Sequence, residues 1–336
     1  MDLRILDISL LKEFKSVVKE SPFEKVDRIA KPDTPIDYFE FYKSVSSVYS
    51  SKIEGVEIDF DSYFKHKFLN VKFNPDYTQK ADDLYSAYEI IDKHELTLEN
   101  VRKAHSILSS SLLPKSQQGL VRTNPMFVLN NDDEIEFVAA GPEIVKQELN
   151  KLFHDITFLR NAELDPFETF YFAAFIHLVF VKIHPFQDGN GRLSRILTNL
   201  LMLQAGYVYM PYASHEKIIE DNKPEYYLAL RQSQKTFTTN HETIAPWLAF
   251  FLDVTLHQSR IALDLFSEEN IEKLLSPRQL EIWQYMQDAI EVTPRELSEK
   301  LAIPRPTINQ VLDRLLELNK IERLGLGRGT RYRVKQ

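Results

Sequence analysis

Apolar residues recur at helical spacing along most of the chain, in blocks separated by short polar connections. A period of this kind is typical of amphipathic helices, so the pattern predicts a mainly α protein. The most apolar block, residues 170–183, contains His177 and Lys182 and is shorter than the roughly 20 residues that cross a bilayer. We therefore expect this block to be a buried core helix, and we expect no membrane partner.

One segment departs from the helical period. Residues 127–129 and 135–138 are rich in apolar and β-branched or aromatic side chains, and four polar residues, 130–133, separate them. Two short runs of this kind around a polar turn predict a β-hairpin, here over residues 126–140.

The pattern changes again at Ser276, a capping residue that precedes a proline at the first helical position. Three short helices and two strands are then expected, at residues 277–290, 294–301 and 306–319 and within 321–334. This order predicts a winged helix-turn-helix.

The predicted organisation is a helical N-terminal region at 1–99, a helical core at 100–256, a connecting helix or linker at 257–275 and the winged helix-turn-helix at 276–336.

Composition narrows the chemistry that is available to the chain. Its 43% hydrophobic and 27% charged residues are ordinary for a globular protein and exclude a disordered or collagen-like chain. The absence of cysteine excludes disulfides, thiol nucleophiles and cysteine-based zinc sites, and it fits a reducing compartment. Because Asp2 and Asp7 do not match the start of a secretory signal, we expect a cytoplasmic protein.

The chain has a net charge of -8, and its charged residues are distributed unevenly along the sequence. Residues 276–336 carry 11 Lys and Arg against 8 Asp and Glu, and the rest of the chain carries 30 against 41. The acidic body argues against a dedicated nucleic-acid binder, whereas the small basic module can contact phosphate. The residues expected to make such contacts are Arg305, Thr307, Asn309, Gln310 and Arg314 on the last helix and Arg328, Arg331 and Arg333 on the wing. A winged helix also serves as a protein-contact or dimer module, so DNA contact, protein contact and a homodimer are all left open.

Candidate chemistry gathers in the segment H-P-F-Q-D-G-N-G-R-L-S-R, residues 184–195, between two predicted helices. Its glycines permit positive φ at several consecutive positions, so backbone N–H groups can form an anion-binding nest at the start of the second helix. Arg192 and Arg195 are three residues apart on that helix and can flank a polyphosphate. Asp188 can hold Mg²⁺ against the phosphates, and His184 is suited to accept a proton from a hydroxyl.

This segment resembles the signature of the Fic family, H-P-F-x-D-G-N-G-R-x-x-R, at every specified position, and the resemblance extends from roughly residue 30 to residue 255. It implies a helical Fic core that uses ATP and Mg²⁺ to transfer AMP to a Ser, Thr or Tyr hydroxyl of a target protein, with self-modification possible. By position it implies His184 as the base, Phe186 as a buried anchor and Asp188 as the metal ligand. The implied ligands of the ATP phosphates are Gly189, Asn190, Gly191, Arg192 and Arg195.

Two further segments take their roles from the same resemblance. The hairpin is similar to the family's flap, which aligns a target segment by strand addition, with Phe137 and Val138 as docking residues. It lacks the prolines that end a typical flap. Downstream, Asn222, Tyr226 and Tyr227 resemble the stretch beside the nucleotide base.

Residues 50–55, S-S-K-I-E-G, resemble the family's inhibitory motif, S/T-x-x-x-E-G/N. Ser50 and Glu54 are four residues apart on a predicted helix that Gly55 can end. We expect a buried Glu54 to form a bidentate pair with Arg195 and to occupy the place of the terminal phosphate of ATP. The resemblance therefore implies an autoinhibited enzyme whose inhibitory helix precedes the core.

Three other functions stay open. A DNA-binding regulator could keep the Fic core as a degenerate sensor, although the intact motif argues against this. Phosphotransfer as in the Doc-like kinases uses the same fold, but those enzymes carry Ala and Lys at the positions of Gly189 and Gly191, so the two glycines favour AMP transfer. The third is removal of AMP from a modified target, with Glu54 positioning water. His177 is interpreted as a hydrogen-bonded core residue without a role in the chemistry.

Overall fold

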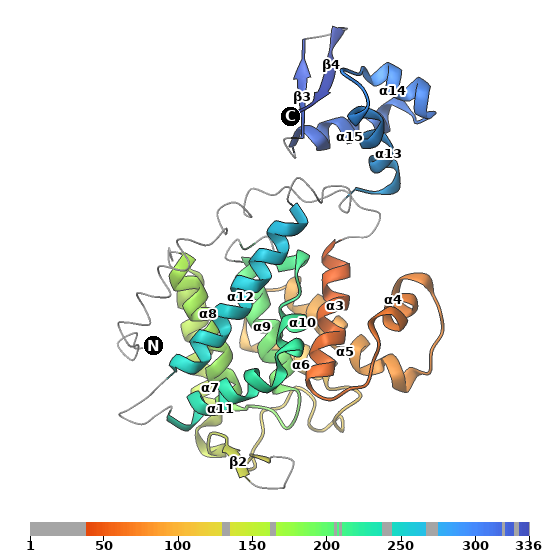
Figure 1. Ribbon diagram of the computed structural model, residues 1–336. Coiled ribbons are helices and arrows are strands. Elements are labelled where there is room, and N and C mark those ends of the chain that lie inside the picture. Colours follow the sequence, from red (N-terminus) through yellow and green to blue (C-terminus); the bar gives the residue numbers. More distant parts are fainter. Residues whose placement is uncertain are drawn as a thin grey trace.

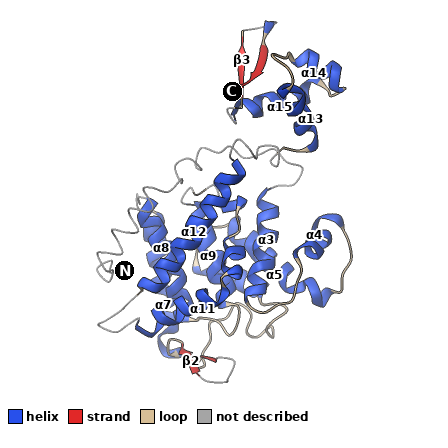
Figure 2. Ribbon diagram, viewed as in Figure 1, coloured by secondary structure: helices blue, strands red, loops and turns tan. Residues whose placement is uncertain are grey.

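Helices make up most of the molecule, as the computed structural model of the chain shows in Figure 1. The structure describes residues 38–129, 135–161, 166–204, 207, 210–236, 244–266, 275–317, 320–325 and 329–335. Within these ranges the strands form two antiparallel pairs, and all the rest of the regular structure is helical (Figure 2). The mainly α fold predicted from the sequence is confirmed.

Four helices precede the hairpin: α3 (Tyr38–Ile53), α4 (Phe60–Leu69), α5 (Pro75–Asp92) and α6 (Leu98–Leu108). Asp59, Asn74 and Thr97 begin α4, α5 and α6, because each side chain accepts a hydrogen bond from an N–H group of the first turn. Helix α3 packs against α5 and against α10 (His215–Asp221), a helix far along the chain. This packing brings the segment around Glu54 to the core helices.

The predicted hairpin is present between α6 and the core helices. Strand β1 (Phe127–Leu129) pairs antiparallel with β2 (Ile135–Val138), and Phe127 lies opposite Val138. The turn expected at residues 130–133 lies outside the described residues.

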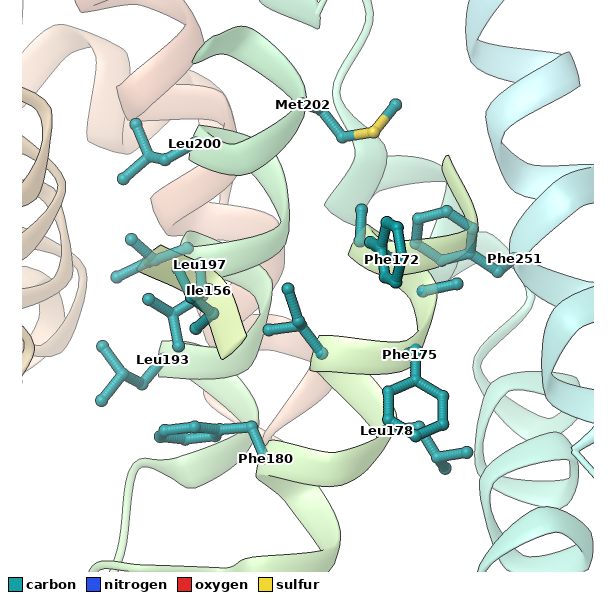
Figure 3. Packing of buried hydrophobic residues seen from close by; sticks show 14 of the residues in the cluster. Ile156, Phe172, Phe175, Leu178, Phe180, Leu193, Leu197, Leu200, Met202 and Phe251 are labelled. Carbon is teal, nitrogen blue, oxygen red and sulfur yellow. The ribbon is translucent and has the colours of Figure 1, made fainter. Parts of the chain in front are cut away.

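The main hydrophobic core lies around α8 (Pro166–Ile183) and α9 (Asn190–Gln204), which pack side by side. Their side chains fill the space between the helices, together with Ile156 and Phe251 from neighbouring helices (Figure 3). The helices around this pair are α7 (Pro142–Arg160), α10, α11 (Lys223–Thr236), α12 (Ala245–Phe266) and the short 3₁₀ helix η2 (Met210–Tyr212). Because α8 is buried along nearly its whole described length, it is the core helix expected at residues 170–183. Among the described helices, none combines the length and the hydrophobicity needed to cross a membrane.

Helix α12 leads from the core into the segment expected to be a connecting helix or linker. It runs as one helix through residue 256, where the sequence pattern predicts that the core gives way to a connecting segment. Ala262 is fully buried and belongs to the main hydrophobic core. The core therefore extends beyond residue 256, and residues 267–274 of the expected connection lie outside the described residues.

The C-terminal helices and strands have a hydrophobic core of their own. They are α13 (Pro277–Gln287), α14 (Pro294–Leu301), α15 (Arg305–Glu317), β3 (Ile321–Leu324) and β4 (Arg331–Val334). Ser276 begins α13 with a capping box to Gln279. This helix ends before the predicted residue 290, because Val292 must be extended to exchange backbone hydrogen bonds with Tyr332.

One of the tail residues expected to face a partner does not do so. Arg314 is only 8% exposed, on the side of α15 that also carries the buried Val311 and Leu315. Arg305, Asn309 and Gln310 are exposed, as expected, whereas Thr307 is half-buried. Among the expected wing residues, Arg328 lies outside the described residues, and ion pairs join Arg331 to Glu291 and Arg333 to Glu322.

Candidate active site

The side chain of Asn190 closes the loop between α8 and α9 with two hydrogen bonds to the backbone of Phe186. The Phe186 N–H donates to Asn190 Oδ1 (2.9 Å), and the Asn190 amide donates to Phe186 O (2.8 Å). Phe186 is fully buried in the main core, where it anchors the loop. Because its side chain is used within the loop, Asn190 can contribute to an anion site only through its backbone, at the start of α9.

The expected nest of consecutive positive φ angles is wrong. Within the loop, all of which the structure describes, His184 (φ 48°) and Gly189 (φ 83°) alone have positive φ, and Gly191 lies in the first turn of α9. The donors available to an anion are therefore the N–H groups of a helix N-terminus, which carries partial positive charge. Gly191 lets the Glu54 carboxylate approach the start of α9, since a Cβ there would lie 2.5 Å from Glu54 Oε1 in its present position.

His184 follows the last residue of α8. Its Nδ1 lies 3.1 Å from Val181 O, which can only accept, so Nδ1 carries the proton and Nε2 keeps a lone pair. Burial lowers the pKa of His184; the hydrogen bond to Val181 opposes this effect, and the charge of Arg122 reinforces it. The imidazole is therefore neutral at neutral pH and can accept a proton at Nε2, as a general base must.

Asp188 and Arg192 form an ion pair across the first turn of α9. Asp188 Oδ1 accepts from Arg192 Nη2 (3.0 Å) and from the Gly189 N–H. Arg192 is buried, whereas the Asp188 side chain is 49% exposed. The described part of the chain contains no cluster of three or more His, Asp or Glu side chains that could hold a metal by themselves. A half-exposed carboxylate beside an anion site does fit Mg²⁺, which takes one or two carboxylates and completes its shell with phosphate oxygens and water.

Arg195 is fully buried and is held by residues at the distant C-terminal end of α3. Its Nε donates to Ser50 Oγ (2.8 Å), and its Nη2 donates to Ser50 O (3.1 Å) and to Glu54 Oε1 (2.7 Å). The expected bidentate pair between Glu54 and Arg195 is wrong, because Ser50 occupies the Nε side and leaves one carboxylate oxygen on one guanidinium nitrogen. The structure nevertheless brings Ser50, Glu54 and Arg195 together across more than 140 positions of sequence.

Glu54 places a negative charge at the start of α9. Its side chain is 29% exposed, so the carboxylate expected to be buried is only partly buried. Partial loss of solvent raises the pKa of Glu54, but the charges of Arg195 and Arg192 outweigh this effect and hold the pKa below its ordinary value. The carboxylate is therefore ionised at neutral pH, at a position where a helix N-terminus and two arginines attract an anion.

The end of α3 sets the position of Glu54. Gly55 has φ 81°, its N–H donates to Lys52 O (3.0 Å), and the Val56 N–H donates to Ser51 O (3.1 Å). These two hydrogen bonds define a Schellman cap, in which the left-handed residue is usually glycine. The sequence expectation that Gly55 ends the helix is confirmed, with Glu54 as the cap residue directly after the last helical position.

The two tyrosines predicted to lie beside the nucleotide base have other partners. Tyr226 is buried, and its hydroxyl lies 3.0 Å from His177 Nε2 and accepts from Arg195 Nη1 (3.4 Å). The Tyr227 hydroxyl donates to Ile53 O (3.2 Å), at the end of α3. Asn222 caps α10. In this structure both tyrosines therefore support the contact between α3 and Arg195, and His177 is the hydrogen-bonded core residue expected from the sequence.

Two further residues, His105 and Arg122, contact the loop and are not predicted from the sequence. The ring of His105 stacks on Phe186, with centroids 3.8 Å apart, and Gly119 N–H donates to its Nδ1, so its Nε2 carries the proton and donates to Asp188 O (2.8 Å). Burial lowers the pKa of His105 to about 4. Arg122 donates to His184 O (2.6 Å). Neither has a sequence signal, because each is an isolated polar residue whose partner lies 83 or 62 positions away.

The hairpin offers a surface beside the site. Among the described strands, β1 and β2 pair only with each other. Val138 is 58% exposed and Phe127 is 49% exposed, whereas Phe137 is half-buried. An exposed strand edge with apolar side chains is suited to take up an extended peptide.

Part of the chain is similar in sequence to known proteins. The Fic/DOC family model matches residues 95–202. Protein adenylyltransferase fic-1 of Caenorhabditis briggsae is 28% identical over 141 residues, which cover 41% of this chain and 24% of that protein. Protein adenylyltransferase Fic of Nematostella vectensis is 30% identical over 164 residues, which cover 48% of this chain and 33% of that protein. The matched region thus spans a third or less of the length of these relatives.

A solved structure shares the fold. A Fic family protein from Desulfovibrio desulfuricans G20 superposes with a TM-score of 0.59 at 19% identity, covering 100% of this chain and 97% of that chain. Fold and site together define a helical protein built around a helix–loop–helix that can bind an anion at the start of its second helix. Residues 95–202 of the chain match the Fic/DOC family.

Proposed function

We propose that this protein transfers AMP from ATP to a hydroxyl side chain of a target protein, and that Glu54 holds the resting enzyme inactive. The observation that carries this proposal is the position of the Glu54 carboxylate. It lies 2.7 Å from Arg195 Nη2 and against Gly191, at the helix N-terminus that would receive phosphate. The names of the two relatives described above, both protein adenylyltransferases, support the reaction.

His184 is the proposed base. As the target hydroxyl attacks the α-phosphorus of ATP, its proton passes to Nε2, the new oxygen–phosphorus bond forms, and the bond to pyrophosphate breaks. The hydrogen bond from Nδ1 to Val181 O supports this role because it leaves Nε2 as the nitrogen that accepts. A lowered pKa keeps the imidazole neutral before the reaction.

The proposed phosphate ligands are the N–H groups at the start of α9, with Arg192 and Arg195. Arg192 also holds Asp188, so one guanidinium both orients the proposed metal ligand and adds positive charge to the site. When bound there, Mg²⁺ would neutralise part of the charge of the phosphates. Asp188 is the residue proposed to hold it, since its carboxylate is half-exposed beside the anion site.

Electrostatic competition is the proposed basis of autoinhibition. Glu54 is ionised and already accepts from Arg195, so a terminal phosphate that needs the same arginine meets both a negative charge and an occupied donor. The nucleotide must therefore displace Glu54 or bind with its α-phosphorus out of line with the attacking hydroxyl. Displacing the carboxylate would switch the enzyme on.

The proposed target is a protein that presents its hydroxyl on an extended segment. The exposed edge of the hairpin and its apolar Phe127 and Val138 support capture by strand addition. A segment of this chain could serve as well, which would give self-modification.

Labelled ATP tests the proposal. Protein carrying Glu54→Gly is incubated with cell lysate and with ATP labelled at either the α- or the γ-phosphate. We expect label from the α-phosphate on protein and none from the γ-phosphate. Transfer of γ-label instead would indicate phosphotransfer, and loss of α-label from pre-modified protein on adding the unmutated enzyme would indicate the reverse reaction.

A further inference from the structure

Arg122 connects the hairpin to the loop that carries His184. It lies in the segment between α6 and β1 and is 6% exposed. On one side its guanidinium donates to Ile183 O (3.1 Å) and His184 O (2.6 Å), at the end of α8. On the other side it donates to Asn124 O (2.7 Å) and Ala140 O, which flank the two strands of the hairpin.

The same contacts surround the backbone of His184. His184 has φ 48°, a left-handed conformation that is uncommon for residues other than glycine and that ends α8 here. The last carbonyls of α8 have no partners within the helix, and Arg122 supplies donors and a positive charge to them. The backbone N–H of Arg122 also donates to Pro185 O (2.9 Å). One residue thus binds three successive carbonyls around His184.

The hairpin is attached at the same point. Asn124 and Ala140 lie just before β1 and just after β2, so a guanidinium bonded to both fixes the base of the hairpin relative to α8. The Ala140 N–H adds a weaker bond to Lys182 O (3.4 Å). Only a planar guanidinium presents enough donors in one plane for this arrangement, because an ammonium has three donors on a single atom.

We propose that Arg122 is a positioning residue, which keeps His184 Nε2 in register with a target segment docked on the hairpin. This inference rests on the AMP transfer proposed above. Its consequence is that Arg122 acts on the transfer step and not on nucleotide binding, since its partners are all backbone oxygens of α8, its following loop and the hairpin.

The test compares Arg122→Gln and Arg122→Lys in protein that also carries Glu54→Gly. The control is Arg102→Gln, because Arg102 also donates to a backbone oxygen, Gly119 O (2.9 Å) in the segment between α6 and β1, but this bond involves neither the hairpin nor α8. Thermal unfolding, ATP affinity and the initial rate of AMP incorporation are measured for each protein. We expect Arg122→Gln to lower kcat by about 100-fold, the cost of a misplacement of about 1 Å. ATP affinity should be unchanged, Arg122→Lys should recover part of the rate, and Arg102→Gln should match the parent.

Hydrogen exchange supplies a readout that does not need activity. In Arg122→Gln, amides of both residues 135–140 and residues 182–186 should exchange faster, while those of α9 should not. Faster exchange at one segment alone, or an unchanged kcat in folded Arg122→Gln or Arg122→Lys protein, would overturn the proposal. Failure of both variants to fold would assign Arg122 to stability and overturn it as well. Absence of AMP incorporation by the Glu54→Gly protein itself would instead refute the proposed function, and exchange would still decide whether Arg122 couples the two segments.

Discussion

At the scale of single residues, the reactivity of His184 follows from its Nδ1 hydrogen bond to Val181 O, which leaves Nε2 to accept a proton. We predict that His184→Ala, made in Glu54→Gly protein, abolishes AMP transfer and leaves ATP affinity nearly unchanged. A general base contributes about 10²–10⁴-fold to a rate, and the phosphate donors lie on α9. Initial rates and ATP binding are the measurements, with His94→Ala, an exposed histidine, as the control. Transfer by the His184→Ala protein at the parental rate would remove His184 from the mechanism.

His105 makes stability depend on pH. Burial lowers its pKa to about 4 in the folded protein, against about 6.5 in an unfolded chain. Between these values the unfolded state binds a proton that the folded state does not, so the free energy of unfolding decreases as pH falls from about 6.5 to about 4. The buried His177 and His215, whose pKa values are also lowered, act in the same direction.

We therefore predict that His105→Gln loses less stability than the parent between pH 7.5 and pH 5.5, by about 1 kcal/mol. Denaturant unfolding at the two pH values measures the difference, and His94→Gln should behave as the parent does. Equal losses in the parent and His105→Gln proteins would mean that His105 takes up its proton equally in both states.

The reactive positions can be predicted from the sequence because they stand in one short segment and need no distant partner to be recognised. The contacts of Glu54 and Arg195 cannot be predicted to the same detail. Their single-oxygen geometry arises because Ser50 reaches Nε from a helix 145 positions away. His105 and Arg122 give no signal at all, since their partners are backbone oxygens that only folding brings near.

At the scale of elements, two hydrogen bonds and one ion pair join the C-terminal end of α3 to α11 and to Glu220, which lies shortly before α11. Lys52 O accepts from Lys223 Nζ (3.4 Å), Ile53 O accepts from the Tyr227 hydroxyl (3.2 Å), and Lys52 Nζ lies 3.4 Å from Glu220. Carbonyls at a helix end lack partners within the helix, so these donors stabilise the position of α3 and with it that of Glu54.

We predict that Tyr227→Phe raises AMP transfer by roughly 2- to 10-fold, the effect of losing a hydrogen bond worth about 0.5–1.5 kcal/mol. Adding Tyr227→Phe to Glu54→Gly should give no further increase, because the inhibitory carboxylate is already gone. A decrease in both backgrounds would instead favour the nucleotide contact that the resemblance implies for Tyr227.

The hydrophobic pattern identifies helices but does not locate their ends. The apolar block at residues 170–183 identifies α8 because burial on all sides leaves no polar face. The pattern does not locate the end of the core, since residues after 256 keep a helical period and only the packing of Ala262 shows where they belong. Likewise α13 ends early for a reason that is distant in sequence, the pairing of Val292 with Tyr332.

At the scale of the whole molecule, the C-terminal module has its own hydrophobic core and its own charge balance. We predict that removing residues 276–336 from Glu54→Gly protein leaves the rate of self-modification unchanged, because the described site residues all lie before residue 228. Initial rates with α-labelled ATP, compared at equal folded fraction, measure this. A large loss of rate in the folded, shortened protein would show that the module contributes to the site.

Autoinhibition as proposed depends on the charge of Glu54. Initial rates of AMP incorporation from α-labelled ATP are compared for the parent, Glu54→Gly and Glu54→Gln, at matched folded fraction, with the exposed Glu57→Gly as the control. A charge-assisted hydrogen bond worth about 1.5–3 kcal/mol corresponds to a gain of roughly 10- to 100-fold when it is removed. We predict a gain of this size for Glu54→Gly, a smaller gain for Glu54→Gln, whose amide oxygen can still accept from Arg195 but carries no charge, and none for Glu57→Gly. A rate at or below that of the parent in both folded Glu54 variants would contradict the account.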